Sequence, residues 1–152
     1  MANTTFTGPV RSQNGFQDIS IDSTTGAVTV NATFGSATSI ASLTTTGNVT
    51  VGGAIIGSTQ DLSGSGAVNL TTGTTKVTTT GSAAALTLAN GTDGQIKMVV
   101  MVVDGGGDAT ITPTTATGYT TIVLNSAGDA VILQYFTTLG WMVISNYGAT
   151  IA

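Results

Sequence analysis

Apolar and polar residues alternate with a period of two along most of this chain, which is the pattern of β-strands that bury one face. β-branched residues are abundant, and glycine or asparagine-glycine breaks recur at short intervals. No stretch keeps apolar residues at helical spacing without an intervening glycine. The pattern therefore predicts an all-β protein with short turns.

The first clear element is a hairpin that begins at Asp18. Ile19 and Ile21 alternate with polar neighbours, a Ser-Thr-Thr-Gly turn follows, and Val28 and Val30 continue the alternation in a second strand. The sequence therefore predicts one short hairpin with one apolar face.

Between this hairpin and residue 82, short runs of Val, Leu and Thr end in glycine at 43–53, 68–73 and 76–81. Because the runs differ in length, they do not predict a regular solenoid. Large apolar side chains are also sparser over residues 1–82 than over residues 83–152. A segment with so little apolar volume can close a core only by sharing it, so we expect this Thr/Gly-rich β region, residues 18–82, to associate with a partner.

The remainder, residues 83–152, has enough apolar volume for a core of its own. We predict an antiparallel β-sandwich-like carboxyl-terminal domain, with candidate strands at 84–89, 95–103, 108–112, 119–124, 130–136 and 141–147. The strands at 95–103 and 130–136 are apolar on both faces. Such strands need either a covered outer face or a sheet that packs against a neighbouring subunit.

Residues 1–17 are expected to form an extended arm. The Gly8-Pro9 pair interrupts regular structure, and the only apolar anchors are Phe6, Val10 and Phe16. An arm of this kind binds a partner or is disordered in the isolated protein.

The composition excludes much catalytic chemistry, because the chain contains no His, no Cys and no Glu. A Ser-His-Asp triad, a Cys-His pair and a thiolate or imidazole zinc site are therefore impossible. Charged residues make up only 7% of the chain and the net charge is −4, with Arg11, Lys76 and Lys97 as the only cations. Since these form no basic stripe, we expect no nucleic-acid binding.

The amino-terminal residues are polar and have no cationic region followed by an apolar run, so we expect no secretory signal and synthesis in the cytoplasm. The longest strongly apolar run, 96–103, is far shorter than a membrane span and contains Lys97. No membrane partner is therefore expected.

The positive charge of Lys97 must form an ion pair, reach solvent or lie at a subunit contact. An interface salt bridge or an edge-strand position is favoured over an intramolecular Lys-Asn crosslink, which would need a neighbouring Asp.

The loop Asp104-Gly105-Gly106-Gly107-Asp108 places two carboxylates beside flexible backbone. Carboxylate and backbone oxygens are the ligands that a calcium site uses. It lacks the ligand spacing of an EF-hand, so a plain hairpin loop is favoured and no metal or cofactor is expected. Thr-x-Thr pairs such as Thr110 and Thr112 resemble the hydroxyl ladders of ice-binding solenoids, but their spacing drifts along the chain.

Two stretches resemble known proteins. The opening MANTTFTGPVRSQNGF is similar to the amino-terminal arm of small structural proteins of tailed bacteriophages, particularly marine and cyanobacterial ones. The carboxyl-terminal block, from LTLANGTDGQIKMVVMVVDGGGDATITP through GDAVILQYFTTLGWMVISNYGATIA, is similar to a β-rich module of phage capsid decoration proteins and some tail-fibre proteins. The middle, TGNVTVGGAIIG, resembles the short β units of trimeric phage fibres.

The resemblance implies a homotrimeric structural virion protein without enzymatic activity, made in the host bacterial cytoplasm and located on the capsid exterior. Such a cement protein would bridge major capsid protein subunits and stabilise the shell. We expect the arm to add to an exposed sheet edge of the capsid protein, with Phe6, Val10 and Phe16 as anchors and Arg11 as the cationic contact.

Two alternatives remain open. One is a trimeric fibre or spike involved in host attachment, present in a few copies per virion. The other is a carbohydrate-active enzyme, for which Asp104 and Asp108 would be the closest carboxylate pair in the sequence.

Overall fold

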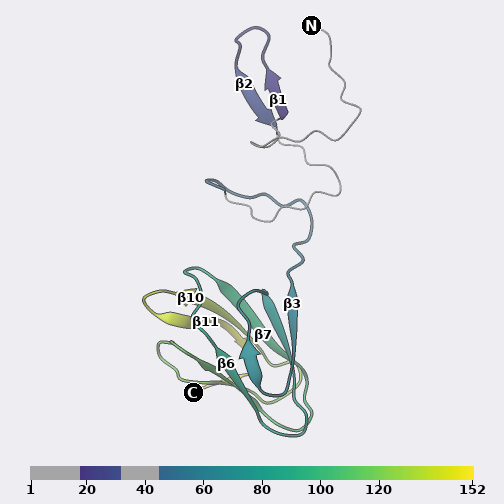
Figure 1. Cartoon of the computed structure of the whole chain (residues 1–152), viewed down its shortest axis with the longest axis vertical. Helices are drawn as coiled ribbons and strands as arrows, with labels where there is room; N and C mark the ends of the chain where they lie inside the picture. The colour runs from purple at the N-terminus through teal and green to yellow at the C-terminus, as the bar shows by residue number, and fades with distance from the viewer. Residues whose placement is uncertain (1–17, 32–44) are drawn as a thin grey trace. The chain divides into compact units, whose positions relative to one another are not determined.

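The computed structural model describes residues 18–31 and 45–152, and the chain divides into two units, residues 1–50 and residues 51–152. In the first unit, β1 (Asp18–Ile21) and β2 (Val28–Asn31) form the predicted antiparallel hairpin (Figure 1). The Asp22 carboxylate organises its turn by accepting hydrogen bonds from the amides of Thr24 and Thr25, both at 2.8 Å. These hydrogen bonds lower the pKa of Asp22.

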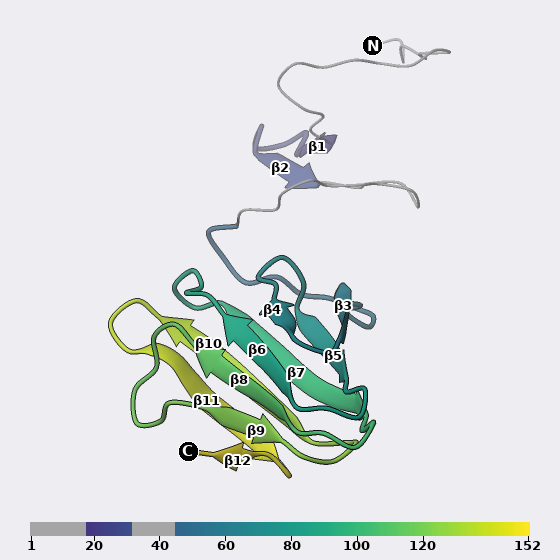
Figure 2. The ribbon, with the colours of Figure 1, turned by 60° about the horizontal axis from the view of Figure 1, so that its bottom comes forward.

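The second unit consists of two five-stranded sheets that pack together, which confirms the predicted all-β, sandwich-like fold (Figure 2). The first sheet has the order β11-β10-β7-β5-β3 and the second has the order β12-β9-β8-β6-β4. The strands are β3 (Thr59–Ser63), β4 (Gly66–Val68), β5 (Thr74–Thr78), β6 (Ala84–Leu88), β7 (Ile96–Val103), β8 (Ala109–Pro113), β9 (Ile122–Leu124), β10 (Ala130–Phe136), β11 (Gly140–Tyr147) and β12 (Thr150–Ile151).

The strand directions differ in part from the predicted antiparallel arrangement, because some neighbouring strands are parallel. From β3 to β8 the chain crosses to the other sheet after every strand, so that β3, β5 and β7 are parallel, and so are β4, β6 and β8. These six strands make three successive turns of the chain around the core, each with one strand in each sheet: β3-β4, β5-β6 and β7-β8. We refer to each such turn as a coil. The strands β9 to β12 then add antiparallel neighbours, which makes both sheets mixed.

The coils also explain why the sequence lacked a regular repeat. Thr59 is aligned with Thr74, and Thr74 is aligned with Met98, so successive coils differ in length. The strands stay in register because the turns absorb the extra residues. In addition, β3, β4 and β5 belong to the two-sheet unit although they precede residue 83, so this unit begins earlier than the predicted domain 83–152.

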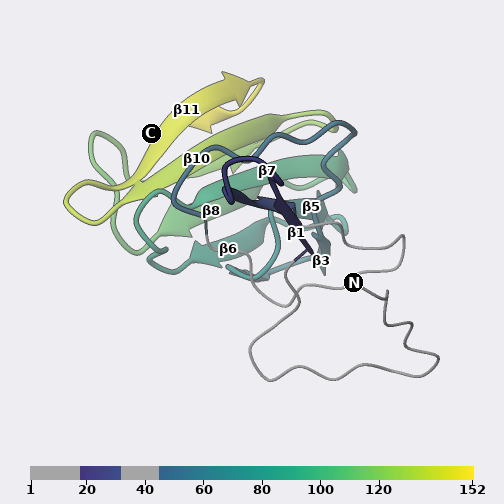
Figure 3. The same ribbon diagram turned by 90° about the horizontal axis from the view of Figure 1, so that it is seen from above.

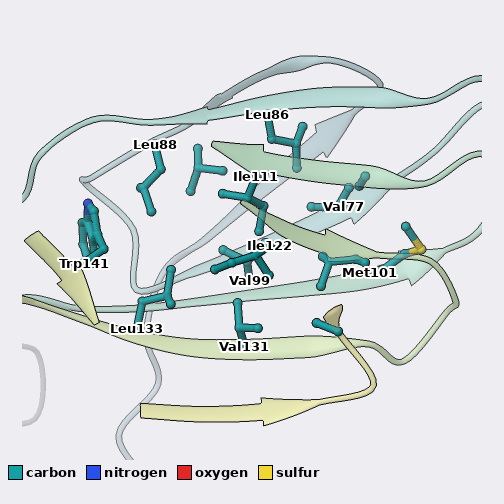
Figure 4. Packing of buried hydrophobic residues seen from close by; sticks show 14 of the residues in the cluster. Val77, Leu86, Leu88, Val99, Met101, Ile111, Ile122, Val131, Leu133 and Trp141 are labelled. Atoms are coloured by element: carbon teal, nitrogen blue, oxygen red, sulfur yellow. The ribbon is translucent and has the colours of Figure 1, made fainter. Parts of the chain in front are cut away.

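The core lies between the two sheets and is formed by the inward side chains of both (Figure 4). Its largest member, Trp141, is fully buried, and its indole Nε1 donates a hydrogen bond of 2.8 Å to the Ala89 carbonyl. The Tyr135 ring lies edge-on to it, at 5.3 Å between ring centroids. Smaller buried side chains fill the rest of the space, including Val77, Leu86, Leu88, Val99, Met101, Ile111, Ile122, Leu124, Val131 and Leu133.

Candidate functional site

The outer face of the first sheet is divided into a polar half and an apolar half (Figure 3 shows the order of its strands). On β3 and β5 the outward residues are polar, and Lys76 forms an ion pair with Asp61 across the two strands, at 2.6 Å between Nζ and Oδ1. On β7, β10 and β11 the outward residues are mostly apolar. The change occurs between β5 and β7, in the middle of the sheet.

We refer to the second half as the apolar face and define it by six residues: Ile96, Met98, Val100, Val102, Ile132 and Ile144. The exposed fractions are 60% for Ile96, 58% for Ile144, 44% for Val102 and 37% for Met98, while Val100 and Ile132 are half-buried. None of these positions carries a charge or a hydrogen-bonding group. A contiguous exposed apolar surface of this kind marks a site of association.

The strand register brings these side chains together. Met98 on β7 lies beside Ile132 on β10, and the next outward position of β7, Val100, lies beside Ala130. A bulge between Ile132 and Leu133 shifts the register against β11 and accommodates the additional residue Ile144. The apolar face is therefore continuous across β7 and β10, while on β11 Ser145 is aligned with Ile132 and Ile144 is the adjacent bulge residue.

The alternating burial of side chains along β7 explains why the apolar face is exposed. Its inward residues Lys97, Val99 and Met101 are fully buried, while Met98 and Val102, which alternate with them, remain exposed. Apart from Lys97, both faces of the strand are apolar, but in the described part of the chain only the inner one is covered. The sequence allowed a covered outer face or packing against a neighbouring subunit, and the described residues of one copy supply no cover.

The predicted capsid-binding residues Phe6, Val10, Arg11 and Phe16 lie outside the described residues. Their proposed role therefore rests on the sequence.

The glycine-rich sequence of the loop 104–108 is explained by its packing. Asp104 Oδ1 accepts a hydrogen bond from the Gly106 amide, and the Gly105 amide donates one to Thr79 Oγ1, both at 2.8 Å. A Cβ atom at Gly105 would collide with the backbone of Thr79, and one at Gly107 would collide with the backbone around Ser82. The glycines thus allow the turn between β7 and β8 to stack closely on the turn between β5 and β6. Among the described residues, no three acidic side chains gather into a metal-binding group.

The position of Lys97 differs from the predicted interface salt bridge or edge-strand position. It lies on β7, which pairs with β10 on one side and β5 on the other, so it is not on an edge strand. Its side chain is fully buried, and Nζ donates hydrogen bonds to the carbonyl and hydroxyl oxygens of Thr72, at 2.8 and 3.0 Å. Within residues 18–31 and 45–152, the one ion pair joins Lys76 and Asp61. A buried lysine bound to neutral oxygens was missed because the sequence does not show which loop faces it.

Burial lowers the pKa of Lys97 from 10.5 to about 8. Between these two values the unfolded chain holds the proton while the folded chain has released it, so the unfolded state binds more protons. The free energy of unfolding should therefore rise with pH from about 8 upward, by roughly 1–3 kcal/mol in total. Urea unfolding at pH 7 to 10 measures this. Measurements should stop near pH 10, because burial raises the pKa of Tyr119 to about 12 and gives the opposite slope at higher pH.

The matched controls are Lys97→Met, which removes the buried ammonium, and Lys76→Met, which removes a half-buried ammonium that is paired with Asp61. We expect the rise in stability to disappear in Lys97→Met and to persist in Lys76→Met. An equal rise in all three proteins would assign it to another group.

No protein-family model matches the chain, and a comparison with curated proteins gives no match. Among the residues whose structure is described, no helix is long and apolar enough to cross a membrane.

Proposed function

We propose that this protein is a structural virion protein that decorates the outside of a phage capsid as a homotrimer. In this role it bridges major capsid protein subunits and stabilises the shell against internal pressure. The observation that carries the proposal is the apolar face, an uncharged surface that the described residues of a lone copy leave exposed. The resemblance of the arm and of the carboxyl-terminal block to phage proteins gives the cellular context.

The apolar face is assigned to contacts between copies. Three copies can turn this face toward a common axis, so that Met98 and Ile132 of each copy contact their counterparts. Burial of apolar surface contributes roughly 25 cal/mol for each Å² removed from water. The polar half of the same sheet, with Lys76 and Asp61, then remains in solvent at the rim.

The capsid contact is assigned to the arm, residues 1–17. Phe6, Val10 and Phe16 would enter apolar pockets of the capsid protein, with Arg11 beside a carboxylate. In this proposal the two-sheet unit forms the contacts between copies, and the arm binds the capsid.

Deletion of residues 2–16 tests the attachment. Capsids that lack the native protein should bind the full-length protein at hundreds of copies and the truncated protein at least tenfold less, as measured by cosedimentation and gel densitometry. The matched control is the full-length variant Thr87→Asp, which places a charge on the exposed face of the other sheet and should bind normally. Full occupancy by the truncated protein would contradict the role of the arm.

The second candidate is a trimeric tail or head fibre or spike that contributes to host attachment. It is favoured by the segment TGNVTVGGAIIG, which resembles fibre units and leads directly into the coils that begin at β3. Copy number distinguishes the two functions, because quantitative mass spectrometry of intact virions should find hundreds of copies for a decoration protein and a handful for a fibre.

A further inference from the structure

The three coils have two different ends. At one end, the antiparallel strands β9 and β10 pair with β8 and β7 and cover the last coil. At the other end, β3 pairs only with β5, and β4 only with β6, among the described residues. Their outer edges present backbone N–H and C=O groups that a further strand could bind. Stacked coils usually require a cap at each end, and this end has none in residues 45–152.

The interior at this end is closed by a side chain. The Gln60 amide donates to the Ala67 carbonyl at 2.8 Å and accepts from the Asn69 amide and the Thr75 hydroxyl, both at 2.9 Å. Gln60 thus ties β3 to β4 and β5 and keeps the coil in shape. No strand of residues 45–152 pairs with the outer backbone edge of β3.

An uncovered apolar segment immediately precedes this edge. Val51, Ile55 and Ile56 are exposed by 50%, 82% and 93%. Adjacent residues of an extended chain point to opposite sides, so Ile55 and Ile56 make both faces of the segment apolar. Residues 51–58 also contain no charge. A segment with these properties is suited to burial against a partner.

We propose that residues 51–56 of one copy add as a strand to the open edge of β3 in a neighbouring copy. This inference rests on the proposed homotrimer and identifies its connecting element. Each chain carries both the free strand and the free edge, so the contact is head-to-tail, and three such contacts close a ring. The lengths agree, because six extended residues span about 20 Å, close to the length of the five-residue β3.

The link to β3 argues against pairing within one chain. The Ser58 carbonyl already accepts a hydrogen bond from the Thr74 amide, which holds Ser58 in line with β3 and beside β5. Only Gly57 would then be left to reverse the chain, whereas the tightest common hairpins need two loop residues. Pairing with a second copy requires no reversal.

Disulfide trapping between copies tests the proposal, because the chain has no cysteine of its own. A tagged chain with Val51→Cys is coexpressed with an untagged chain that carries either Thr59→Cys or Ser63→Cys, which mark the two ends of β3. One of the two pairs should give a covalent heterodimer on oxidation, and which one does so reports the direction of the added strand. The control partner is Thr87→Cys on the second sheet. Heterodimer at the control level for both pairs would overturn the proposal.

A second test uses charge. Ile55→Asp and Ile56→Asp alter side chains that are exposed in the single chain, so the two-sheet unit should fold normally while trimer affinity falls at least tenfold. Unchanged trimers in both variants would overturn the strand exchange and leave a trimer held by the apolar face. A wild-type protein that is monomeric would overturn both proposals.

Discussion

Replacing Met98 with aspartate is expected to convert the trimer into folded monomers. Met98 lies within the apolar face beside Ile132, so its counterpart in a trimer would be surrounded by apolar side chains of other copies. An unpaired carboxylate buried there costs several kcal/mol. A loss of about 3 kcal/mol corresponds to a trimer affinity lower by roughly a hundredfold. Sedimentation velocity over a concentration series measures this change.

The same variant should leave the two-sheet unit folded, because the Met98 side chain points outward and 37% of it is exposed. Thr112→Asp is the matched control, since it places the same charge at an exposed position on the outer face of the second sheet. We expect Thr112→Asp to assemble like the wild type. If Met98→Asp also assembles with wild-type affinity, the apolar face is not the contact between copies.

Replacing Trp141 with alanine is expected to produce the largest loss of stability of any single core substitution. Removal of a fully buried tryptophan costs about 3–5 kcal/mol, through lost transfer energy and the cavity left behind. The Ala89 carbonyl also loses its hydrogen bond, and the Tyr135 ring loses its edge-on partner. Since a domain of this size is stable by about 5–15 kcal/mol, the variant should unfold at much lower urea concentrations.

Trp141→Phe separates these contributions, because it keeps an aromatic ring but removes the indole donor. It should cost less than half as much as the alanine variant in the same urea titration. A loss below about 1 kcal/mol for Trp141→Ala would mean that the core between the two sheets is not the main source of stability.

The alternation of apolar and polar residues predicted the hairpin at 18–31 and the strands β6 to β11, but it did not place β3, β4, β5 or β12. It predicted a strand at 130–136, where β10 lies, and one at 84–89, where β6 ends only one residue earlier. It could not predict strand partners, because a period of two shows which side chains face inward but not which strand lies alongside. A glycine-rich turn such as 104–108 looks like a hairpin, yet here it carries the chain across to the other sheet.

The candidate site was predicted only in part, because a period of two does not show which neighbours cover each face of a strand. The two-sided apolar character of residues 95–103 indicated a surface in need of a partner, and the structure places Met98 and Val102 on it. The sequence did not show that Lys97 faces the interior, because one polar residue inside an apolar run can point either way. The exposure of Ile55 and Ile56 also required the structure, since two isoleucines after Gly52-Gly53-Ala54 fit a buried strand equally well.

The measurement that tests the account most directly is the molar mass of the purified full-length chain in solution, by sedimentation equilibrium. Pooling of apolar surfaces between copies predicts a species with three times the chain mass of 15.0 kDa, which dissociates on dilution. A single species of 15.0 kDa at every concentration at which the protein stays soluble would contradict it.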